Sequence, residues 1–168
     1  MHTTFFVPGQ PQGKARARTV NYGGRVHSYT PKNTRVYESS IRQSYILAGG
    51  KKADRETPVS VSITAVFRVP QSYTKKAKAE CYSGKRKPMI KPDADNICKA
   101  VLDALNGAAY EDDTQVTFLD IMKKYEEEPD NEGLMICVRS LTQKEREYAP
   151  PIEEKSNENM PTWDGWDW

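Results

Sequence analysis

The sequence predicts a single domain of the α+β class, in which a mixed β-sheet carries helices mainly on one side. The chain of 168 residues is long enough for one ordinary hydrophobic core, with little left for a second. Residues 59–69 alternate apolar and small polar side chains, which indicates a strand, whereas residues 95–106 place apolar side chains at helical spacing. We expect the domain to occupy residues 1–143.

The first third of the chain contains signals for a strand, a hairpin and a helix. Residues 3–7 are strand-like and are followed by chain-breaking proline and glycine. Two glycines at 23–24 indicate a hairpin turn, with residues 26–30 as the returning strand. The Thr-Pro pair at 30–31 predicts a helix start with proline in the first helical position, and the glycines at 49–50 end that helix.

The remaining elements continue the same alternation. After the strand at 59–69 we expect a basic helix at 73–82 and a basic loop, SGKRKPMIKP, at 83–92. The amphipathic helix at 95–106 leads through a turn into a long strand at 115–125. A last strand at 134–141 completes the sheet.

The segment 144–168 is expected to be a flexible acidic tail outside the domain. Residues 150–168 contain two adjacent prolines, five acidic residues, one lysine and three tryptophans. Indoles carry much binding energy per residue, so Trp163, Trp166 and Trp168 suggest a segment that docks on a protein partner or folds back onto a DNA-binding surface. A tail that only aids solubility explains the composition equally well.

Composition argues against several classes of protein. No apolar run has the length of a membrane span, so we expect a cytoplasmic protein without membrane contact. Cys81, Cys98 and Cys137 are an odd number without C-x-x-C spacing, which disfavours a disulfide framework or a zinc site. His2 and His27 are the only histidines, which disfavours a histidine-based triad.

Charge is distributed unevenly along the chain although the net charge is only +2. Residues 1–92 hold 18 lysines and arginines against 4 acidic residues, whereas residues 93–168 hold 7 against 19. This asymmetry predicts a basic surface for a polyanion beside an acidic cluster that requires cations. If basic residues of the first part lie beside acidic residues of the second part in the fold, their charges would cancel part of this asymmetry.

The most informative segment is the stretch from Lys91 to Lys99. Asp93 and Asp95 fall at the start of the predicted helix, where unpaired N–H groups and the helix dipole favour carboxylates. Plain helix capping explains one aspartate well and the pair less well. Lys99 lies one turn after Asp95 on the same face, and an ordinary surface ion pair is the alternative for it.

A second acidic group, Glu111, Asp112 and Asp113, lies in the turn before the strand at 115–125. Three consecutive acidic residues usually belong to a solvent-exposed loop without a function of their own. A helix followed by a reversing strand, however, can fold Asp113 back towards Asp93 and Asp95. Three convergent carboxylates repel one another unless a cation lies among them, and an all-oxygen set suits Mg²⁺. Beside a basic surface the natural substrate is a phosphodiester, so the residues indicate a metal-dependent nuclease.

The stretch KPDADNICKAVLDALNGAAYEDDTQV, residues 91–116, resembles the signature of the RusA family of Holliday junction resolvases. That signature combines Asp-x-Asp-Asn-x-x-Lys, an Ala-Leu-Asn/Asp-Gly helix end and an acidic doublet followed by Gln-Val. The resemblance covers roughly residues 3–141 and includes an early basic motif, GQPQGKARAR, at 9–18. Ala17 departs from the family, which often has proline there.

The resemblance implies a RusA-like fold and roles for particular residues. Asp93, Asp95 and Asp113 match the metal-binding aspartates, Lys99 matches a catalytic lysine, and Asp112 matches a less essential acid. It also implies a homodimer that uses Mg²⁺, with Mn²⁺ as a substitute, to make paired nicks in a branched DNA junction. Such enzymes act in the bacterial cytoplasm and are bacterial or phage-encoded.

Basic residues of the early motif and the 83–92 loop are expected to contact DNA phosphates. The set comprises Lys14, Arg16, Arg18, Arg25, Lys85, Arg86, Lys87 and Lys91. Two alternatives to the resolvase stay open: a non-catalytic protein that binds DNA junctions, and a nuclease that acts on flaps or forks. In the first alternative, lysines, arginines or backbone N–H groups would pair with each carboxylate, whereas a metal site leaves the carboxylates convergent and largely unpaired.

Overall fold

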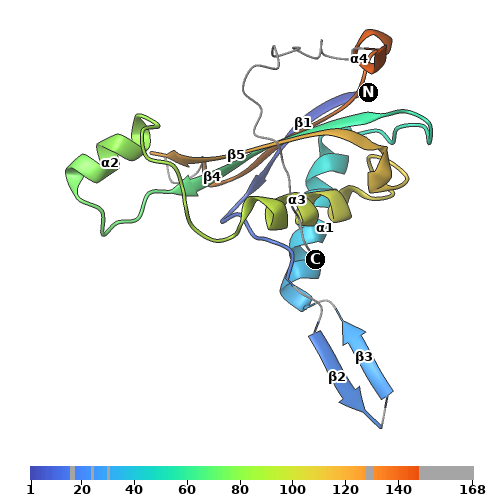
Figure 1. The fold of residues 1–168 in the computed structure, drawn as a ribbon, viewed down its shortest axis with the longest axis horizontal. Helices are drawn as coiled ribbons and strands as arrows, with labels where there is room; N and C mark the ends of the chain where they lie inside the picture. Colours follow the sequence, from blue (N-terminus) through green and yellow to red (C-terminus); the bar gives the residue numbers. More distant parts are fainter. Residues whose placement is uncertain (16–17, 24, 30, 128–130, 148–168) are drawn as a thin grey trace, which may run out of the picture.

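The computed structural model describes residues 1–15, 18–23, 25–29, 31–127 and 131–147 of the chain (Figure 1). Within these residues the elements are, in order, β1 (His2–Pro8), β2 (Arg18–Tyr22), β3 (Arg25–Tyr29), α1 (Lys32–Leu47), β4 (Val59–Arg68), α2 (Lys75–Tyr82), α3 (Ala94–Leu105), the 3₁₀ turn η1 (Asp113–Gln115), β5 (Val116–Glu126), β6 (Gly133–Ser140) and α4 (Gln143–Glu147). The fold is α+β, as predicted.

The main sheet is mixed and has the strand order β1-β6-β4-β5. β6 pairs antiparallel with both β1 and β4, whereas β5 pairs parallel with β4 and forms one edge of the sheet. The two helices α1 and α3 lie together on one side of this sheet (Figure 1). β2 and β3 form a separate hairpin that projects away from the body of the molecule (Figure 1).

The core lies between the sheet and the helix pair α1–α3. One face of the sheet contributes residues such as Phe5, Ile63 and Ile136, which are buried and share a register row. Tyr45 of α1 meets Phe5 edge-on, with ring centroids 5.5 Å apart. Ile97 and Val101 of α3 are fully buried, which confirms the apolar face predicted for this helix. The core therefore fixes where both ends of α3 lie.

Most predicted boundaries agree with the structure to within two residues, and two details differ. Pro31 occupies the cap position and α1 begins at Lys32, so proline precedes the helix instead of opening it. A short helix, α4, follows β6 where no further element was expected. Its signal is a capping box, in which the Thr142 backbone N–H donates to Glu145 Oε2 at 2.9 Å and the Glu145 N–H donates to Thr142 Oγ1.

The flexible tail was predicted for residues 144–168. Residues 144–147 instead belong to α4, and residues 148–168 lie outside the described residues, so the rest of the tail hypothesis and the domain boundary at 143 stay predictions. Among the helices that the structure describes, none is long and apolar enough to cross a membrane.

Candidate active site

Asp93 and Asp95 lie at the N-terminus of α3, as the sequence predicted. Asp93 occupies the cap position with extended backbone angles, φ −70° and ψ 156°, but its side chain makes no capping hydrogen bond. Asp95 lies in the first helical turn and is exposed. The helix dipole stabilises negative charge at this end. Two carboxylates are therefore presented to solvent rather than bonded to the helix terminus.

Few cations pair with these carboxylates. Asp93 forms an ion pair with Lys91, whose side chain is 83% exposed, and such exposed pairs contribute little to stability. No lysine or arginine whose side chain the structure describes pairs with Asp95 or Asp113. The alternative considered for Lys99, a surface ion pair with Asp95, is not formed, and Lys99 is exposed on α3. The acids are thus largely unpaired, which is one of the two properties expected of a metal site.

The loop after β1 packs directly against the Asp93–Asp95 segment. A Cβ atom added to Gly13 would lie 2.9 Å from the Cβ of Asn96 and 3.0 Å from that of Pro92, so only glycine fits there. The Lys14 backbone N–H donates to the Asn96 carbonyl at 3.0 Å. The start of the early basic motif therefore supports the backbone on either side of Asp93 and Asp95.

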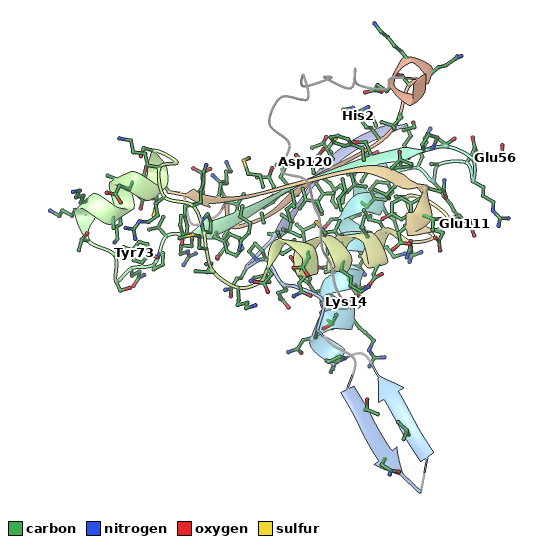
Figure 2. All side chains as sticks on the ribbon, viewed as in Figure 1. His2, Lys14, Glu56, Tyr73, Glu111 and Asp120 are labelled. Carbon is green, nitrogen blue, oxygen red and sulfur yellow. The ribbon has the colours of Figure 1, made fainter. Side chains whose placement is uncertain are left out.

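Lys14 does not present a free charge to DNA, in contrast to its predicted role. Its Nζ pairs with Glu38 of α1 and, at 2.9 Å, with Asp103 of α3, and its side chain is 21% exposed (Figure 2). Burial lowers the pKa of Lys14, but hydrogen bonds and charge from the two carboxylates outweigh this and raise it. Through these two ion pairs Lys14 joins the loop to α1 and α3. The sequence did not indicate either acid as its partner.

The acidic turn lies beyond the other end of α3. Asp112 caps η1 by accepting the Thr114 backbone N–H at 3.0 Å, and this hydrogen bond lowers the pKa of Asp112. Glu111 is exposed, pairs with Lys52 and lies at the periphery of the molecule (Figure 2). Gln115 holds the turn by donating to the carbonyls of Asp54, at 2.8 Å, and Thr57. Asp113 is the half-buried acid that neither caps the turn nor pairs with lysine.

One chain does not bring the three predicted metal ligands together. α3 has 12 residues, which correspond to about 18 Å of helix, and Asp93 precedes it whereas Asp113 follows it. β5 does reverse direction, but Asp113 lies before its first residue and hence stays near Tyr110 at the C-terminal end of α3. Accordingly, no group of three His, Cys, Asp or Glu side chains in the described ranges could hold a metal ion. The expected convergence does not occur within a single chain.

The predicted DNA-contact residues other than Lys14 divide into three groups. Lys85, Arg86, Lys87 and Lys91 are exposed on the loop between α2 and α3, with Arg86 lying over the Tyr73 ring at 5.3 Å. Arg18 and Arg25 belong to β2 and β3 of the projecting hairpin. Arg16 lies outside the described residues. The loop group stands immediately before Asp93 in the chain and therefore carries the basic surface closest in sequence to these acids.

Sequence reasoning missed Lys123, whose Nζ donates to the carbonyls of Ile90 and, at 3.0 Å, Pro92. A signal was available, because Ile121, Lys123 and Tyr125 share one face of a strand and lysine interrupts an otherwise apolar series. Glu38 was missed as well, and its single position in α1 gave no comparable signal.

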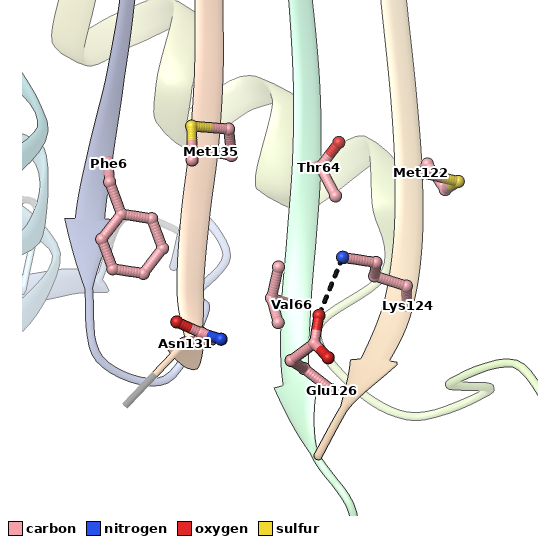
Figure 3. Close-up of a pocket in the computed structure, with 8 residues that line it drawn as sticks. All are labelled: Phe6, Thr64, Val66, Met122, Lys124, Glu126, Asn131 and Met135. Atoms are coloured by element: carbon pink, nitrogen blue, oxygen red, sulfur yellow. Dashed lines mark hydrogen bonds and ion pairs between the residues drawn. The ribbon is translucent and has the colours of Figure 1, made fainter. Parts of the chain in front are cut away.

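A hollow of about 600 Å³ lies on the opposite face of the sheet, away from these acids (Figure 3). It is lined by Phe6, Thr64, Val66, Met122, Lys124, Glu126, Asn131 and Met135. Its one acid, Glu126, pairs with Lys124 at 3.0 Å. The hollow therefore lacks the unpaired carboxylates that a metal-dependent reaction requires.

Comparison with known proteins identifies similarity over most of the chain. The family model described as endodeoxyribonuclease RusA matches residues 8–137, which include both acidic groups and the loop after β1. The chain is also similar to the uncharacterized protein YqaN of Bacillus subtilis (strain 168), with 34% identity over 134 residues. That alignment covers 74% of this chain and 89% of the relative.

Proposed function

The chain belongs to the endodeoxyribonuclease RusA family, and we propose that it resolves four-way DNA junctions by Mg²⁺-dependent hydrolysis of paired phosphodiester bonds. The observation that carries the proposal is the presentation of Asp93 and Asp95 to solvent at the N-terminus of α3, directly after a basic loop. If these aspartates served only to cap the helix, at least the Asp93 carboxylate would accept a hydrogen bond from an N–H group at the helix terminus. It accepts none.

The proposed metal ligands are Asp93, Asp95 and Asp113. Carboxylate oxygens are the donors that Mg²⁺ prefers, and the first two are free of capping bonds and close in sequence, which fits this ion. When bound, the ion lowers the pKa of a coordinated water and stabilises charge on the phosphate oxygens. Lys99, exposed one turn beyond Asp95, is proposed to neutralise charge that develops on the phosphate. Asp112 is left out because it caps η1.

We further propose that the enzyme is a homodimer in which each site takes Asp113 from the partner subunit. Paired nicks in a junction require two sites related by a two-fold axis, so a C2 dimer is expected. Because Asp93 and Asp113 lie at opposite ends of α3, a second chain running antiparallel would bring its Asp113 towards the Asp93 end of the first. The dimer would then complete two sites at once.

β5 is a strand through which two chains could pair in the antiparallel direction that a shared site requires. It is an edge strand of 11 residues, so one side of its backbone is left without a partner strand among the described elements. Phe118, Leu119 and Met122 are 52%, 43% and 47% exposed along it, which is unusual for large apolar side chains on a free edge. β5 starts beside η1 and ends where Lys123 contacts the loop before Asp93. Antiparallel pairing of two β5 strands would therefore supply the geometry that a shared site needs.

Activity is tested by incubating the purified chain with a synthetic four-way junction, a linear duplex and a flap, with and without Mg²⁺. Symmetric cleavage of the junction that depends on the metal supports the proposal. Cleavage of the flap in preference to the junction would replace the resolvase with a flap or fork nuclease. Junction binding without any cleavage in Mg²⁺ or Mn²⁺ would favour the non-catalytic alternative.

The shared site is tested by mixing inactive variants. Asp93→Asn and Asp113→Asn chains should each be inactive alone, but a refolded mixture should regain nicking, because each heterodimer has one site with both native residues. Asp93→Asn mixed with Asp95→Asn is the control and should stay inactive, since both residues come from the same subunit. Failure of the first mixture to recover activity would contradict the shared site without contradicting the metal site itself.

The surface is tested by sedimentation. Replacing Phe118 and Leu119 together by lysine should convert the dimer to a monomer at micromolar concentration and abolish cleavage. Met135→Lys changes a similarly exposed apolar residue on β6, 43% exposed, and should leave the dimer intact. Dissociation by Met135→Lys alone would move the interface from the free edge of β5 to the part of the sheet around β6.

A further inference from the structure

Lys123 is placed where a strand facing a core normally carries an apolar side chain. It shares a face of β5 with Ile121 and Tyr125, and its Nζ lies 5.2 Å from the centre of the Phe67 ring. Phe67 is buried on the neighbouring strand β4. The stem of Lys123 therefore follows the apolar face, and its ammonium group emerges beside the loop that precedes α3.

The ammonium group is held by uncharged partners. It donates to the backbone carbonyls of Ile90 and Pro92, and no carboxylate within the described ranges forms an ion pair with it. Burial lowers the pKa of Lys123, while the charge of Asp93 opposes this. Withdrawing an ammonium group from water costs free energy, and the hydrogen bonds to the two carbonyls offset part of that cost. Those bonds are directed at the two residues that flank Lys91.

The contacts of Lys123 fix the approach of the chain to Asp93. Pro92 precedes Asp93 directly, and Asp93 itself makes no capping bond that would orient its side chain. On the other side, Gly13 packs on Pro92 and Lys14 bonds to Asn96. Lys123 supplies the hydrogen bonds from the sheet side, so the Asp93 segment is held between β5 and the loop after β1.

We propose that Lys123 is a positioning residue that sets the direction of the Asp93 carboxylate for the metal ion, an inference that rests on the proposed function. Residues that orient a metal ligand without touching the metal typically alter metal affinity or activity by about 10–100-fold when replaced. Lys123 acts through the Ile90 and Pro92 carbonyls and contacts neither the metal nor the DNA. Its loss should therefore weaken metal binding more than junction binding.

The test compares Lys123→Met with Lys124→Met in the full-length chain. Lys124 is the next residue of β5, lies on the opposite face of the sheet and pairs with Glu126, so it is a matched control (Figure 3). Direct Mn²⁺ binding is measured by calorimetry, and the Mg²⁺ dependence of cleavage and the junction Kd without metal are measured alongside. Urea unfolding checks that each variant is folded, and Lys123→Arg supplies a conservative variant that retains the charge and the donors.

Lys123→Met should weaken Mn²⁺ binding by about 10–100-fold and raise the Mg²⁺ requirement equally, with the junction Kd unchanged. Lys123→Arg should recover much of the affinity, and Lys124→Met should behave as the unmodified chain does. Native Mn²⁺ affinity in folded Lys123→Met, or an equal loss in Lys124→Met, would overturn the positioning role alone. If Lys123→Met does not fold, Lys123→Gln takes its place, because it also removes the ammonium group. A Mn²⁺ affinity of Lys123→Gln below that of Lys124→Met then supports the role, whereas equal affinities overturn it. Absence of Mn²⁺ and Mg²⁺ binding by the unmodified chain would overturn the proposed metal site as well.

Discussion

The two ends of α3 carry acidic residues on differently built supports. At the N-terminal end, the backbone around Asp93 is held from outside, by Lys123 on β5 and by the loop containing Gly13. At the C-terminal end, the turn is held from within, because Asp112 caps η1 and Gln115 bonds to the neighbouring loop. One end presents two largely unpaired carboxylates, whereas the other uses one of its acids for structure and leaves Asp113 available.

Motifs that are adjacent in a sequence therefore need not form one site within one chain. The helix that separates the acids keeps them apart by its own length, and its buried face fixes both ends against the sheet. If the two ends work as halves of a site, substitutions at both ends should affect cleavage.

The largest effect should follow from removing a proposed ligand. Asp93→Asn, Asp95→Asn and Asp113→Asn should each reduce junction cleavage by on the order of 10³-fold or more, because metal binding and its charge stabilisation are lost. Junction affinity should stay the same or increase, since repulsion between carboxylates and phosphates falls. Asp112→Asn, in the same turn as Asp113, is the control and should retain most activity. Full activity in any of the three variants would remove that residue from the site.

Lys99→Ala should have the next largest effect. Its position one turn beyond Asp95 predicts a loss of about 10²-fold in kcat, because it would stabilise charge on the phosphate in the transition state. The junction Kd should change little. Lys76→Ala, an exposed lysine on α2, controls for the general loss of a positive charge. A change in Kd with an unchanged kcat would make Lys99 a binding residue instead.

Much of the fold was predictable because its signals are local. The alternation in residues 59–69 and the apolar spacing in 95–106 each reflect a face turned towards one core, and both elements appear within two residues of the predicted bounds. The pairing of β5 with β4 depends on contacts distant in sequence, which no local pattern encodes.

The site was predictable in its residues and not in its geometry. The placement of Asp93 and Asp95 at a helix start followed from capping chemistry, and the structure has them there. The position of Asp113 could not be derived, because the direction of the turn after Gly107 decides it. Lys14 illustrates the same limit, since its acidic partners Glu38 and Asp103 lie on two helices whose packing the sequence does not reveal.

A third prediction tests the support of the N-terminal end. Gly13→Ala should destabilise the fold by about 1–3 kcal/mol, because its Cβ has no room beside Pro92 and Asn96 and the backbone must shift. Urea unfolding measures the loss, and cleavage at saturating Mg²⁺ reports any displacement of Asp93. Gln12→Ala, one residue earlier and exposed, should be close to neutral. Equal free energies of unfolding for Gly13→Ala and Gln12→Ala would show that the loop can shift to accommodate a Cβ atom without loss of stability.

A fourth prediction separates Lys14 from the exposed basic loop. Replacing Lys85 and Lys87 together by alanine should reduce the slope of log Kd against log salt by about two, as expected for two lost phosphate contacts. Lys14→Met should leave that slope unchanged and instead lower stability, because Glu38 and Asp103 lose their shared cation. Measurement of junction Kd across a salt series distinguishes the two classes. A reduced slope for Lys14→Met would restore Lys14 to the DNA-contact set.

The smallest effect is expected at Glu111, in the same acidic turn as Asp113. A hydrogen bond and the charge of Lys52 lower the pKa of Glu111, but both side chains are exposed, and exposed ion pairs add little stability. A lowered pKa means that any stabilisation by the pair is present at neutral pH and is lost only as the pH falls through that value. Glu111→Gln should therefore leave cleavage and the urea midpoint at pH 7 unchanged. If Glu111→Gln instead reduces cleavage as strongly as Asp113→Asn does, the turn acts as a diffuse negative patch, and the assignment of Asp113 as a specific ligand at this end of α3 is wrong.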